Sequence, residues 1–298
     1  MKQADELPVV YAIVLNWNGS QTVSQTINSV LSVDYPRVHL IVVDNASTDG
    51  SDEEIQQRFP GVTLIRNNSN LGFAAGNNRG IIQARKNGAE YILLLNNDAI
   101  LDQTSLRRMV SALLADPDRG AVAPKIYFYP SCDERVLWSC GAQWQRFPPR
   151  VTLRGYGERD AGQFDRPGPL TYATACALLI RGETFDRAGL LDESYFMYQE
   201  DYAFSDRVRA SGFTLWYEPR AIVYHHVSAS TGEGSPEKWF YWAKGISLFY
   251  IQHYGNRARA MAPLTTFLLW VMIREVAKGH LNWLKPYWQG VWAGWAEL

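Results

Sequence analysis

The sequence predicts an α/β fold in which a mainly parallel central sheet is flanked by helices. Short, β-branched apolar runs alternate with helical stretches over about the first 100 residues, a spacing typical of βαβ units and of a parallel sheet. Most of these runs lead into a cluster of polar residues. In such sheets ligands bind outside the carboxyl ends of the strands. We therefore expect a ligand site at that edge of the sheet.

The first part of the chain supplies these units in order. We expect strands at 9–15, 39–43, 62–66 and 91–95, and helices at 20–30, 52–58 and 74–86. The polar clusters that follow the strands are 16–19, 44–51, 70–73 and 96–98. Turn and cap formers dominate them, which is typical of loops that lead from a strand into a helix.

The second part of the chain is less regular. Residues 130–169 are rich in Gly, Pro and Arg, which predicts a long, partly irregular insertion near the site. Regularity returns with expected strands at 172–180, 214–217 and 221–224 and an expected helix at 199–210. Beyond Ser235 the sequence predicts helices rich in aromatic residues at 239–254 and 263–278.

Composition and charge narrow the class of protein. The chain has 298 residues, of which 47% are apolar and 20% charged, as in an ordinary globular protein. The net charge of −1 gives no basic footprint for nucleic acid. Cys132, Cys140 and Cys176 form no CxxC pair, so we expect no disulfide framework and a reducing compartment. The N-terminal residues lack a signal-peptide pattern.

Asp98 is a candidate metal ligand. It follows a very apolar predicted strand, in the triplet Asn96-Asn97-Asp98. A carboxylate at such a strand end, beside carboxamides, can bind a hard divalent cation that in turn holds a diphosphate. The alternative is that Asp98 caps the next helix.

Glu200 and Asp201 are candidate acid and base residues. They open a predicted helix after four residues of which three are aromatic, 195–198, and these would partly remove the carboxylates from water. Burial raises the pKa of a carboxyl group and makes it a usable general base near neutral pH. The alternative is that both acids only offset the helix dipole.

Two further strand ends carry functional candidates. His225 and His226 follow the predicted strand 221–224, and only one of two adjacent residues on an extended chain can face a metal site. A pair of surface histidines is the alternative. Asp44 ends its own strand and could accept hydrogen bonds from a nucleobase, whereas a turn explains Asn45 and Ser47.

Seven segments, in this order, resemble glycosyltransferase family 2, the inverting enzymes of the GT-A fold, and especially its rhamnosyltransferase-like members. They are VLNWNG at 14–19, VVDNASTDGS at 42–51, NLGFAAGNNRG at 70–80, LLNND at 94–98, GLLD at 189–192, ED at 200–201 and HHVS at 225–228. The resemblance covers residues 9–230 and therefore most of the chain.

The resemblance implies roles for individual residues. Asp44 would contact the base of the donor, Asp201 would be the catalytic base beside Glu200, and Asp98 and His225 would bind Mg²⁺ or Mn²⁺. The family motif often begins with Asp where Asn96 stands, which makes Asn96 a further metal candidate. The remaining candidates for donor binding are Leu15, Asn16, Asn18, Asn45, Asn70, Gly76, Arg79 and Asn97, and those for acceptor binding are Thr174, Ala175 and Tyr198.

The implied activity is transfer of a sugar from a nucleoside-diphosphate sugar, linked to deoxythymidine or uridine, to a glycan or lipid-linked acceptor. The catalytic domain would cover 1–235, with a donor half at about 1–125 and an acceptor half at about 126–235, followed by a helical region at 236–298. Two alternatives are a sugar-1-phosphate nucleotidyltransferase, which should show a basic loop after the first strand, and an inactive scaffold that binds nucleotide sugar or polysaccharide.

The C-terminal region predicts contact with a membrane surface. Residues 261–273 are uncharged and apolar, but 13 residues are fewer than the roughly 20 that span a bilayer. Five tryptophans and a local net charge of +3 beyond residue 256 suit an anionic interface. We therefore expect a cytoplasmic protein, peripheral on the inner face of the membrane. The alternative is that these aromatic residues pack on the catalytic domain or form a homodimer interface.

Overall fold

The computed structural model describes residues 7–129, 135–227, 235–277 and 283–297. The strands are β1 (Val10–Asn16), β2 (Val38–Asp44), β3 (Thr63–Arg66), β4 (Tyr91–Asn96), β5 (Ala99–Leu101), β6 (Arg119–Phe128), β7 (Leu137–Ser139), β8 (Ala142–Arg146), β9 (Pro149–Leu153), β10 (Gly168–Leu170), β11 (Ala177–Arg181) and β12 (Thr214–His225). The helices are α1 (Val23–Leu31), α2 (Ser51–Arg58), α3 (Gly72–Lys86), α4 (Ser105–Leu114), α5 (Gly182–Ala188), α6 (Glu200–Ala210), α7 (Pro236–Tyr254), α8 (Arg257–Ala277) and α9 (Leu284–Glu297).

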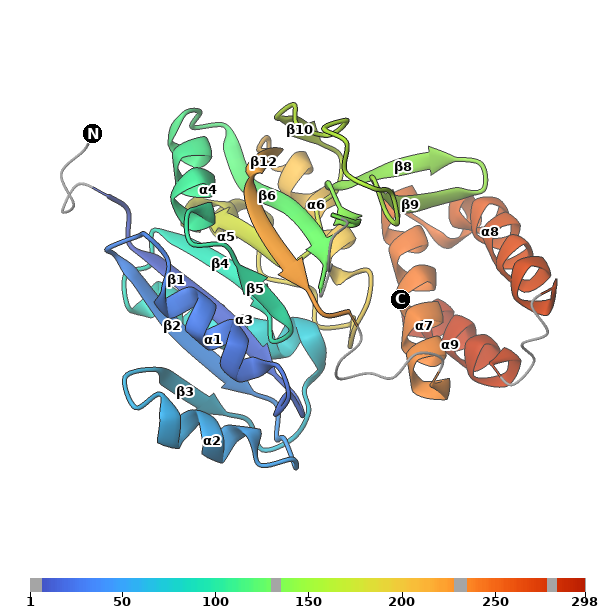
Figure 1. Ribbon diagram of the computed structural model, residues 1–298. Coiled ribbons are helices and arrows are strands. Elements are labelled where there is room, and N and C mark those ends of the chain that lie inside the picture. The colour runs from blue at the N-terminus through green and yellow to red at the C-terminus, as the bar shows by residue number, and fades with distance from the viewer. Residues whose placement is uncertain (1–6, 130–134, 228–234, 278–282, 298) are drawn as a thin grey trace.

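The central sheet has the order β10-β12-β6-β11-β4-β1-β2-β3, with β5 paired to β12 and β7 to β6 (Figure 1). Strands β3, β2, β1 and β4 pair in parallel, as the alternation of strands and helices predicts. The other half is mixed, because β11 runs antiparallel to both β4 and β6 while β12 runs parallel to β6. The α/β fold class is confirmed, and only the first half of the sheet is parallel throughout.

Two apolar clusters cover the two faces of the sheet. One joins the sheet to α1 and α4 through side chains such as Ile27 and Met109. The other joins it to α3, α5 and α6 through side chains such as Ile81 and Phe204. The fold is therefore a three-layer sandwich in which the sheet lies between two layers of helices.

Several element boundaries differ from the sequence predictions. Helix α1 begins at Val23 rather than Ser20, because Gly19 O accepts from the amides of Thr22 and Val23 in a preceding turn. The expected strands 214–217 and 221–224 form one strand, β12, with an irregularity between Glu218 and Ile222 where its pairing with β6 shifts. Strand β11 begins only at Ala177, and residues 174–176 before it line a cavity.

The segment expected to be irregular contains ordered pairing in its described part. Strands β8 and β9 form an antiparallel hairpin, and β7 and β10 extend the edges of the central sheet. The hairpin reaches toward the C-terminal helices in Figure 1. It supplies Leu153 and Arg150 to the cavities described below.

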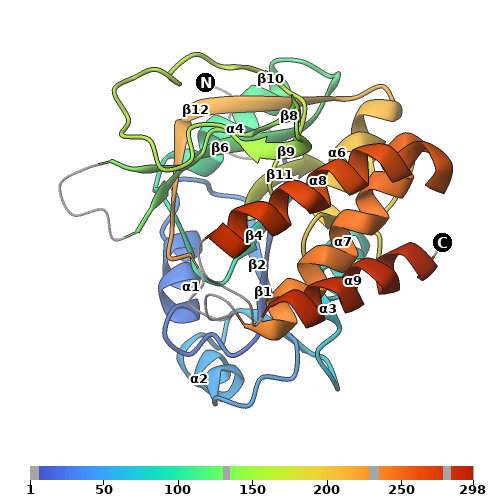
Figure 2. The same cartoon turned by 90° about the vertical axis from the view of Figure 1, so that its right-hand side faces the viewer.

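The three C-terminal helices form a third apolar cluster with the β8–β9 hairpin and with α6 (Figure 2). Helix α9 packs closely on α7: a Cβ atom added at Gly290 would lie 2.1 Å from the Phe240 carbonyl oxygen. Trp283 is buried in this cluster, whereas Trp292 is 69% exposed. Some tryptophans of this region thus pack in the protein interior and others lie on its surface, and the sequence alone did not distinguish the two kinds.

Helix α8 corrects the length expected for the apolar segment. The uncharged run of 13 residues belongs to a helix of 21 residues that is, by length and composition alone, long and apolar enough to cross a membrane. A third of its most apolar window is buried inside the protein, and core helices of soluble proteins pass the same test.

Cys132, Ser228 and Lys278 lie outside the described residues. Cys140 and Cys176 are buried free thiols.

Candidate active site

A cavity of about 550 Å³ lies at the carboxyl ends of β1 and β4, where the sequence predicted a ligand site. Residues before β11, the turn before α6, the end of β12 and the first turns of α7 close it from the other side. Twelve of the candidate residues line it: Leu15, Asn45, Asn70, Asn96, Asn97, Asp98, Thr174, Ala175, Tyr198, Glu200, Asp201 and His225.

Asn16 and Asp44 lie behind the cavity wall and support it. The Nδ2 atom of Asn16 donates to Asp44 Oδ1 at 2.8 Å, and its Oδ1 atom accepts from Asn97 Nδ2 at 3.2 Å. Ser47 donates to both oxygens of Asp44, through its hydroxyl at 2.6 Å and its amide at 2.9 Å. Asp44 is only 2% exposed. The network fixes three strand ends, those of β1, β2 and β4, relative to one another.

Asn45 and Asn70 connect the end of β2 to the start of α3. Asn45 Nδ2 donates to Gly72 O at 2.9 Å and to Asn70 Oδ1 at 3.2 Å. Gly76 does not line the cavity, but a Cβ atom there would lie 2.5 Å from Leu15 Cδ1. The absence of that atom lets α3 approach the two candidate residues Leu15 and Asn45.

Of the five candidates that do not line the cavity, Asn18 and Arg79 also lack a role in supporting its wall. Asn18 accepts a hydrogen bond from the Thr48 amide at 2.8 Å and adopts a positive φ of 50°, so it shapes the loop after β1. Arg79 is exposed on α3 and is not among the residues that line the cavity. The sequence places Arg79 in a matching motif, but only packing decides which side of the helix faces the site.

Asp98 and His225 meet at one end of the cavity. Their Oδ1 and Nε2 atoms are 3.0 Å apart, and both side chains are buried. The contact follows from the sheet, because the antiparallel pairing of β5 with β12 aligns Ala99 with His225. Asp98 therefore leads into a strand rather than capping a helix. The neighbouring His226 packs its ring on Tyr129 at 4.0 Å, so only one histidine faces the cavity, as expected.

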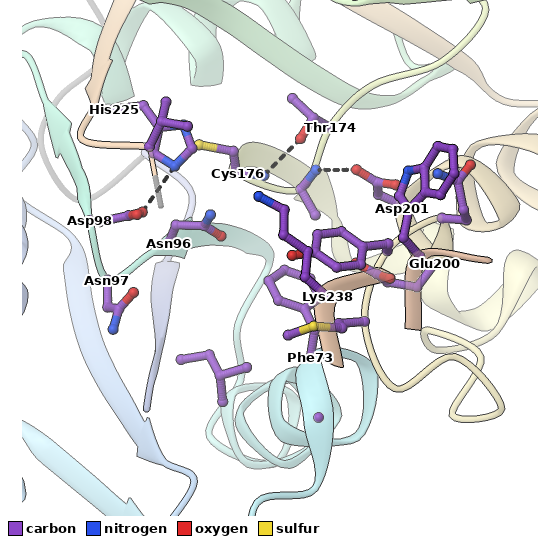
Figure 3. A pocket seen from close by; sticks show the side chains of 18 of the residues that line it. Phe73, Asn96, Asn97, Asp98, Thr174, Cys176, Glu200, Asp201, His225 and Lys238 are labelled. Atoms are coloured by element: carbon purple, nitrogen blue, oxygen red, sulfur yellow. Dashed lines mark hydrogen bonds and ion pairs between the residues drawn. The ribbon is translucent and has the colours of Figure 1, made fainter. Parts of the chain in front are cut away.

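The ionic state of this pair depends on its surroundings. Burial alone disfavours an imidazolium, but the Cys176 thiol and the Asp98 carboxylate outweigh it and raise the pKa of His225 to about 10. Cys176 lies beside the imidazole ring in Figure 3. Burial raises the pKa of the Cys176 thiol.

The carboxylate and imidazole at this end of the cavity suit a divalent cation whose coordination shell is completed by a bound ligand. In the described part of the chain no group of three or more His, Cys, Asp or Glu side chains is arranged to hold a metal. Asp98 and His225 would therefore supply two protein ligands, with Asn96 beside them (Figure 3). Mg²⁺ is commonly held by one or two protein ligands together with substrate phosphates.

A strained turn leads into the opposite end of the cavity. Tyr198 and Gln199 both have positive φ, 70° and 74°, which is rare for residues other than glycine. The turn is held from two sides, because the Phe73 amide donates to Phe196 O and Gly245 of α7 packs against Tyr198 O. Such strain persists only when the surroundings enforce it.

Helix α6 starts directly after this turn with Glu200 and Asp201. The amides of Tyr202 and Ala175 donate to Asp201 Oδ1 and Oδ2 at 2.8 and 3.3 Å. Burial raises the pKa of Asp201 to about 6, which these hydrogen bonds partly oppose. Burial, and then the charge of Asp201, raise the pKa of Glu200 well above its ordinary value. Asp201 thus combines fixed orientation with basicity suited to neutral pH.

Sequence reasoning missed two cavity residues on α7, Lys238 and Trp242. The Lys238 side chain points into the cavity between the Asp98 and Asp201 ends (Figure 3). A signal for the helix start existed, because Ser235 followed by Pro236 is a typical N-terminus and the Ser235 hydroxyl accepts from the Lys238 amide at 3.2 Å. Nothing in the sequence showed that this turn faces the sheet.

Comparisons with known proteins identify the family of the chain. A family model described as Glycosyl transferase family 2 matches residues 11–185. An N-acetylglucosaminyl-diphospho-decaprenol L-rhamnosyltransferase of Mycobacterium tuberculosis is 31% identical over 216 residues, which cover 65% of this chain and 68% of the relative. A poly-beta-1,6-N-acetyl-D-glucosamine synthase of Staphylococcus aureus is 26% identical over 255 residues, which cover 81% of this chain and 55% of the synthase.

The fold has counterparts among solved structures. A mannosyltransferase from Pyrobaculum calidifontis in complex with GDP-Man and Mn²⁺ superposes with a TM-score of 0.61 at 18% identity, covering 98% of this chain and 86% of that one. GalNAc-T7 with UDP, GalNAc and Mn²⁺ superposes with a TM-score of 0.63 at 16% identity, covering 84% and 51%. These likenesses confirm the GT-A fold. From the matched family model and the similarity to the mycobacterial relative, we conclude that the chain belongs to glycosyl transferase family 2 and is a glycosyltransferase.

Proposed function

We propose that this enzyme transfers a sugar from a nucleoside-diphosphate sugar to a hydroxyl group of a lipid-linked glycan, with inversion at the anomeric carbon. One observation carries the proposal: the Asp98–His225 pair and the Asp201 carboxylate face a single cavity from opposite ends (Figure 3). The named activity of the mycobacterial relative favours rhamnose as the donor sugar. The family resemblance of the sequence favours deoxythymidine diphosphate as its carrier.

The donor would occupy the half of the cavity formed by the ends of β1, β2 and β4. Asn45, Asn70 and Asn97 offer amide groups to its nucleoside and sugar. Asp44 supports this wall from behind through Asn16, and its remaining lone pairs are available to a base only if the wall opens slightly. The cavity volume of about 550 Å³ lies in the range typical of sites for small ligands.

Two kinds of positive charge would meet the diphosphate. A divalent cation, Mg²⁺ or Mn²⁺, bound by Asp98 and His225, would neutralise charge on the leaving nucleoside diphosphate. Lys238 adds a fixed ammonium group from α7. Since Lys238 forms no ion pair with any other described residue, its charge is available to a phosphate oxygen.

Asp201 would act as the general base. Its carboxylate, held by the amides of Tyr202 and Ala175, takes the proton of the acceptor hydroxyl. The acceptor oxygen then bonds to the anomeric carbon as the bond from that carbon to the diphosphate breaks. Thr174, Ala175 and Tyr198 line this half of the cavity and would position the acceptor sugar.

A panel of nucleotide sugars tests the proposal. We expect metal-dependent release of nucleoside diphosphate from one donor, with deoxythymidine diphosphate rhamnose first among them. The anomeric configuration of the product, assigned by NMR, should be inverted relative to the donor. Retention of configuration would exclude a single displacement that uses Asp201 as base, and the absence of turnover with every donor would exclude the proposed activity.

We also propose that the enzyme works on the inner face of the cytoplasmic membrane, where nucleotide sugars and a lipid-linked acceptor meet. The outer side of α8 and α9 exposes Leu269, Ile273 and Trp292, while the inner side of both helices is buried in the third apolar cluster. A one-sided apolar surface beside exposed basic residues, such as Arg257 and Arg259, suits docking at an anionic interface.

A further inference from the structure

A second cavity, of about 230 Å³, lies between the β8–β9 hairpin, α7 and α8. It borders the active-site cavity, with which it shares Leu153, Gln199, Tyr202 and Trp242. Tyr202 follows Asp201 in α6. The second cavity therefore begins on the acceptor side of the proposed base.

Two guanidinium groups converge on this second cavity. Arg150 Cζ lies 4.0 Å from the centre of the Trp270 ring, and Arg274 Cζ lies 4.8 Å from the centre of the same ring. Arg274 contacts Glu275 Oε1 at 2.6 Å. Arg150 Nη1 is buried and has no hydrogen-bond partner among the residues that the structure describes.

Among the described side chains, Arg150 has no carboxylate partner in this arrangement, whereas Arg274 is paired with Glu275. Burial, and then the charge of Arg274, lower the pKa of the Arg150 guanidinium, and no carboxylate contributes in the other direction. A buried N–H group without an acceptor destabilises a folded protein, and a second cation nearby adds to the effect. An oxyanion placed between Arg150 and Arg274 would satisfy both, and guanidinium groups bind phosphate oxygens in a bidentate manner.

Apart from Gln199, the rest of the lining is aliphatic or aromatic. Phe249, Tyr250 and Phe267 form an aromatic wall that continues to Trp270. Beyond Trp270 lies the exposed apolar side of α8, where Ile273 is 72% exposed. A ligand of this cavity therefore pairs an anionic group with an apolar chain that can leave toward the outer surface of α8.

We propose that the second cavity binds the diphosphate and the first isoprenoid units of a lipid-linked acceptor, with Arg150 and Arg274 as its anion ligands. The proposal rests on the function proposed above and names the acceptor class of the same enzyme. The shared wall of the two cavities places the sugar of such an acceptor beside Asp201 while its diphosphate occupies the second cavity.

Calorimetric titration of the full chain with farnesyl diphosphate tests the proposal. We expect binding by the wild type, and affinities roughly 10- to 100-fold weaker in Arg150→Gln and in Arg274→Gln, because each loses hydrogen bonds to a charged group. Arg146→Gln is the matched control, since Arg146 lies on the same hairpin, is exposed and lines neither cavity. Equal affinity in the wild type and in both cavity variants overturns the proposal.

Thermal unfolding separates a ligand-binding role of Arg150 from a structural one. Without ligand, Arg150→Gln should unfold at a temperature close to that of the wild type, because the variant removes a buried Nη1 atom without a hydrogen-bond partner among the described residues but also loses the contact of the guanidinium with the Trp270 ring. Farnesyl diphosphate should raise the midpoint of the wild type and not that of the variant. A large drop in the midpoint of ligand-free Arg150→Gln would assign Arg150 to folding and overturn the proposal.

Two further measurements distinguish the ligand sources and the two proposals. Vesicles of phosphatidylglycerol should bind the wild type and Arg150→Gln equally. If Arg150 is needed for binding to these vesicles but not for binding to farnesyl diphosphate, the cavity binds bilayer headgroups instead. Wild-type protein is also assayed for release of nucleoside diphosphate from donors. If nucleoside diphosphate is released but farnesyl diphosphate does not bind in an Arg150-dependent manner, only the proposed acceptor site is wrong. If farnesyl diphosphate binds in that manner but no nucleoside diphosphate is released, only the proposed transfer reaction is wrong.

Discussion

Gly245 of α7 lies directly against the carbonyl group of Tyr198, and a Cβ atom added at position 245 would be 2.4 Å from that oxygen. The contact joins the C-terminal helices to the strained turn that precedes Glu200 and Asp201. Helix α7 thus contributes to the candidate site in two ways, since it supplies Lys238 to the cavity and also packs against the turn before the proposed base.

Replacement of Gly245 by Ala should therefore damage the site and the fold together. We expect a loss of about 1–3 kcal/mol in unfolding free energy from overpacking, with a fall in kcat as the turn shifts. Gly61→Ala is the control, because a Cβ atom at Gly61 meets no atom within 4 Å. Denaturant unfolding and donor turnover measure the two effects. Wild-type behaviour of Gly245→Ala would show that the turn does not depend on α7.

Asp201→Asn should lower turnover about 10²- to 10⁴-fold with donor affinity nearly unchanged, because only the proton acceptor is lost. In the wild type, kcat should fall as the pH decreases through about 6, since the raised pKa of Asp201 leaves the base protonated below that value. Asp186→Asn, a change in a surface ion pair with Arg85, serves as control. Full turnover in Asp201→Asn would assign the base to another group.

Chelation should weaken nucleoside diphosphate binding, and Asp98→Ala and His225→Ala should do the same. In each case the phosphates lose their cation or one of its two protein ligands. Mn²⁺ or Mg²⁺ should restore the chelated wild type but not the variants. His39→Ala is the control, because His39 stacks on Tyr11 away from the cavity. Donor affinity that is indifferent to chelator, measured by calorimetry, would argue against a metal at Asp98.

Glu200→Gln should stabilise the protein at alkaline pH. Glu200 Oε2 is buried and has no hydrogen-bond partner within the described chain, and its raised pKa means that the folded state holds the proton more tightly than the unfolded chain. The carboxyl group therefore reduces stability as the pH rises above its ordinary value of about 4.5.

We expect Glu200→Gln to gain about 1–3 kcal/mol at pH 8 and little at pH 4, where both side chains are neutral. Glu183→Gln, at a surface pair with Arg187, should change little at either pH. Unfolding free energies of the wild type and both variants, measured at the two pH values, test this prediction. A destabilised Glu200→Gln at pH 8 would mean that the carboxylate has a structural partner.

Full-length protein should float with anionic vesicles, and a variant with Leu269, Ile273 and Trp292 replaced by Ser should not. Point substitutions are preferable to removal of α9, because Gly290 and Gly294 pack on the backbone of α7 and its loss would expose an apolar face. Ile82→Ser, at an exposed site on α3, is the control. If the wild type never floats but forms a dimer that the triple variant cannot form, the surface is an oligomer interface.

The sequence by itself determined the local structure and the chemistry at the strand ends. Apolar runs, turn formers and caps are local signals, and they located β1, β2 and β4 together with the polar residues that follow them. The parallel direction of these strands follows from their alternation with helices, whereas their order β4-β1-β2-β3 comes from the tertiary structure. The twelve candidates that line the cavity come largely from such strand ends, because parallel strands bring their carboxyl ends to one edge.

Only the tertiary structure decided which distant side chains meet. Asp98 contacts His225 because β5 pairs with β12, a contact that no periodicity in the sequence encodes. Lys238 enters the cavity, and Arg79 is kept out of it, because packing selects the face that each helix turns inward. Likewise, Arg150 and Arg274 share the ring of Trp270 only because α8 lies against the β8–β9 hairpin. The local sequence pattern determines where a helix or strand forms, whereas packing of its apolar face against other elements determines its orientation.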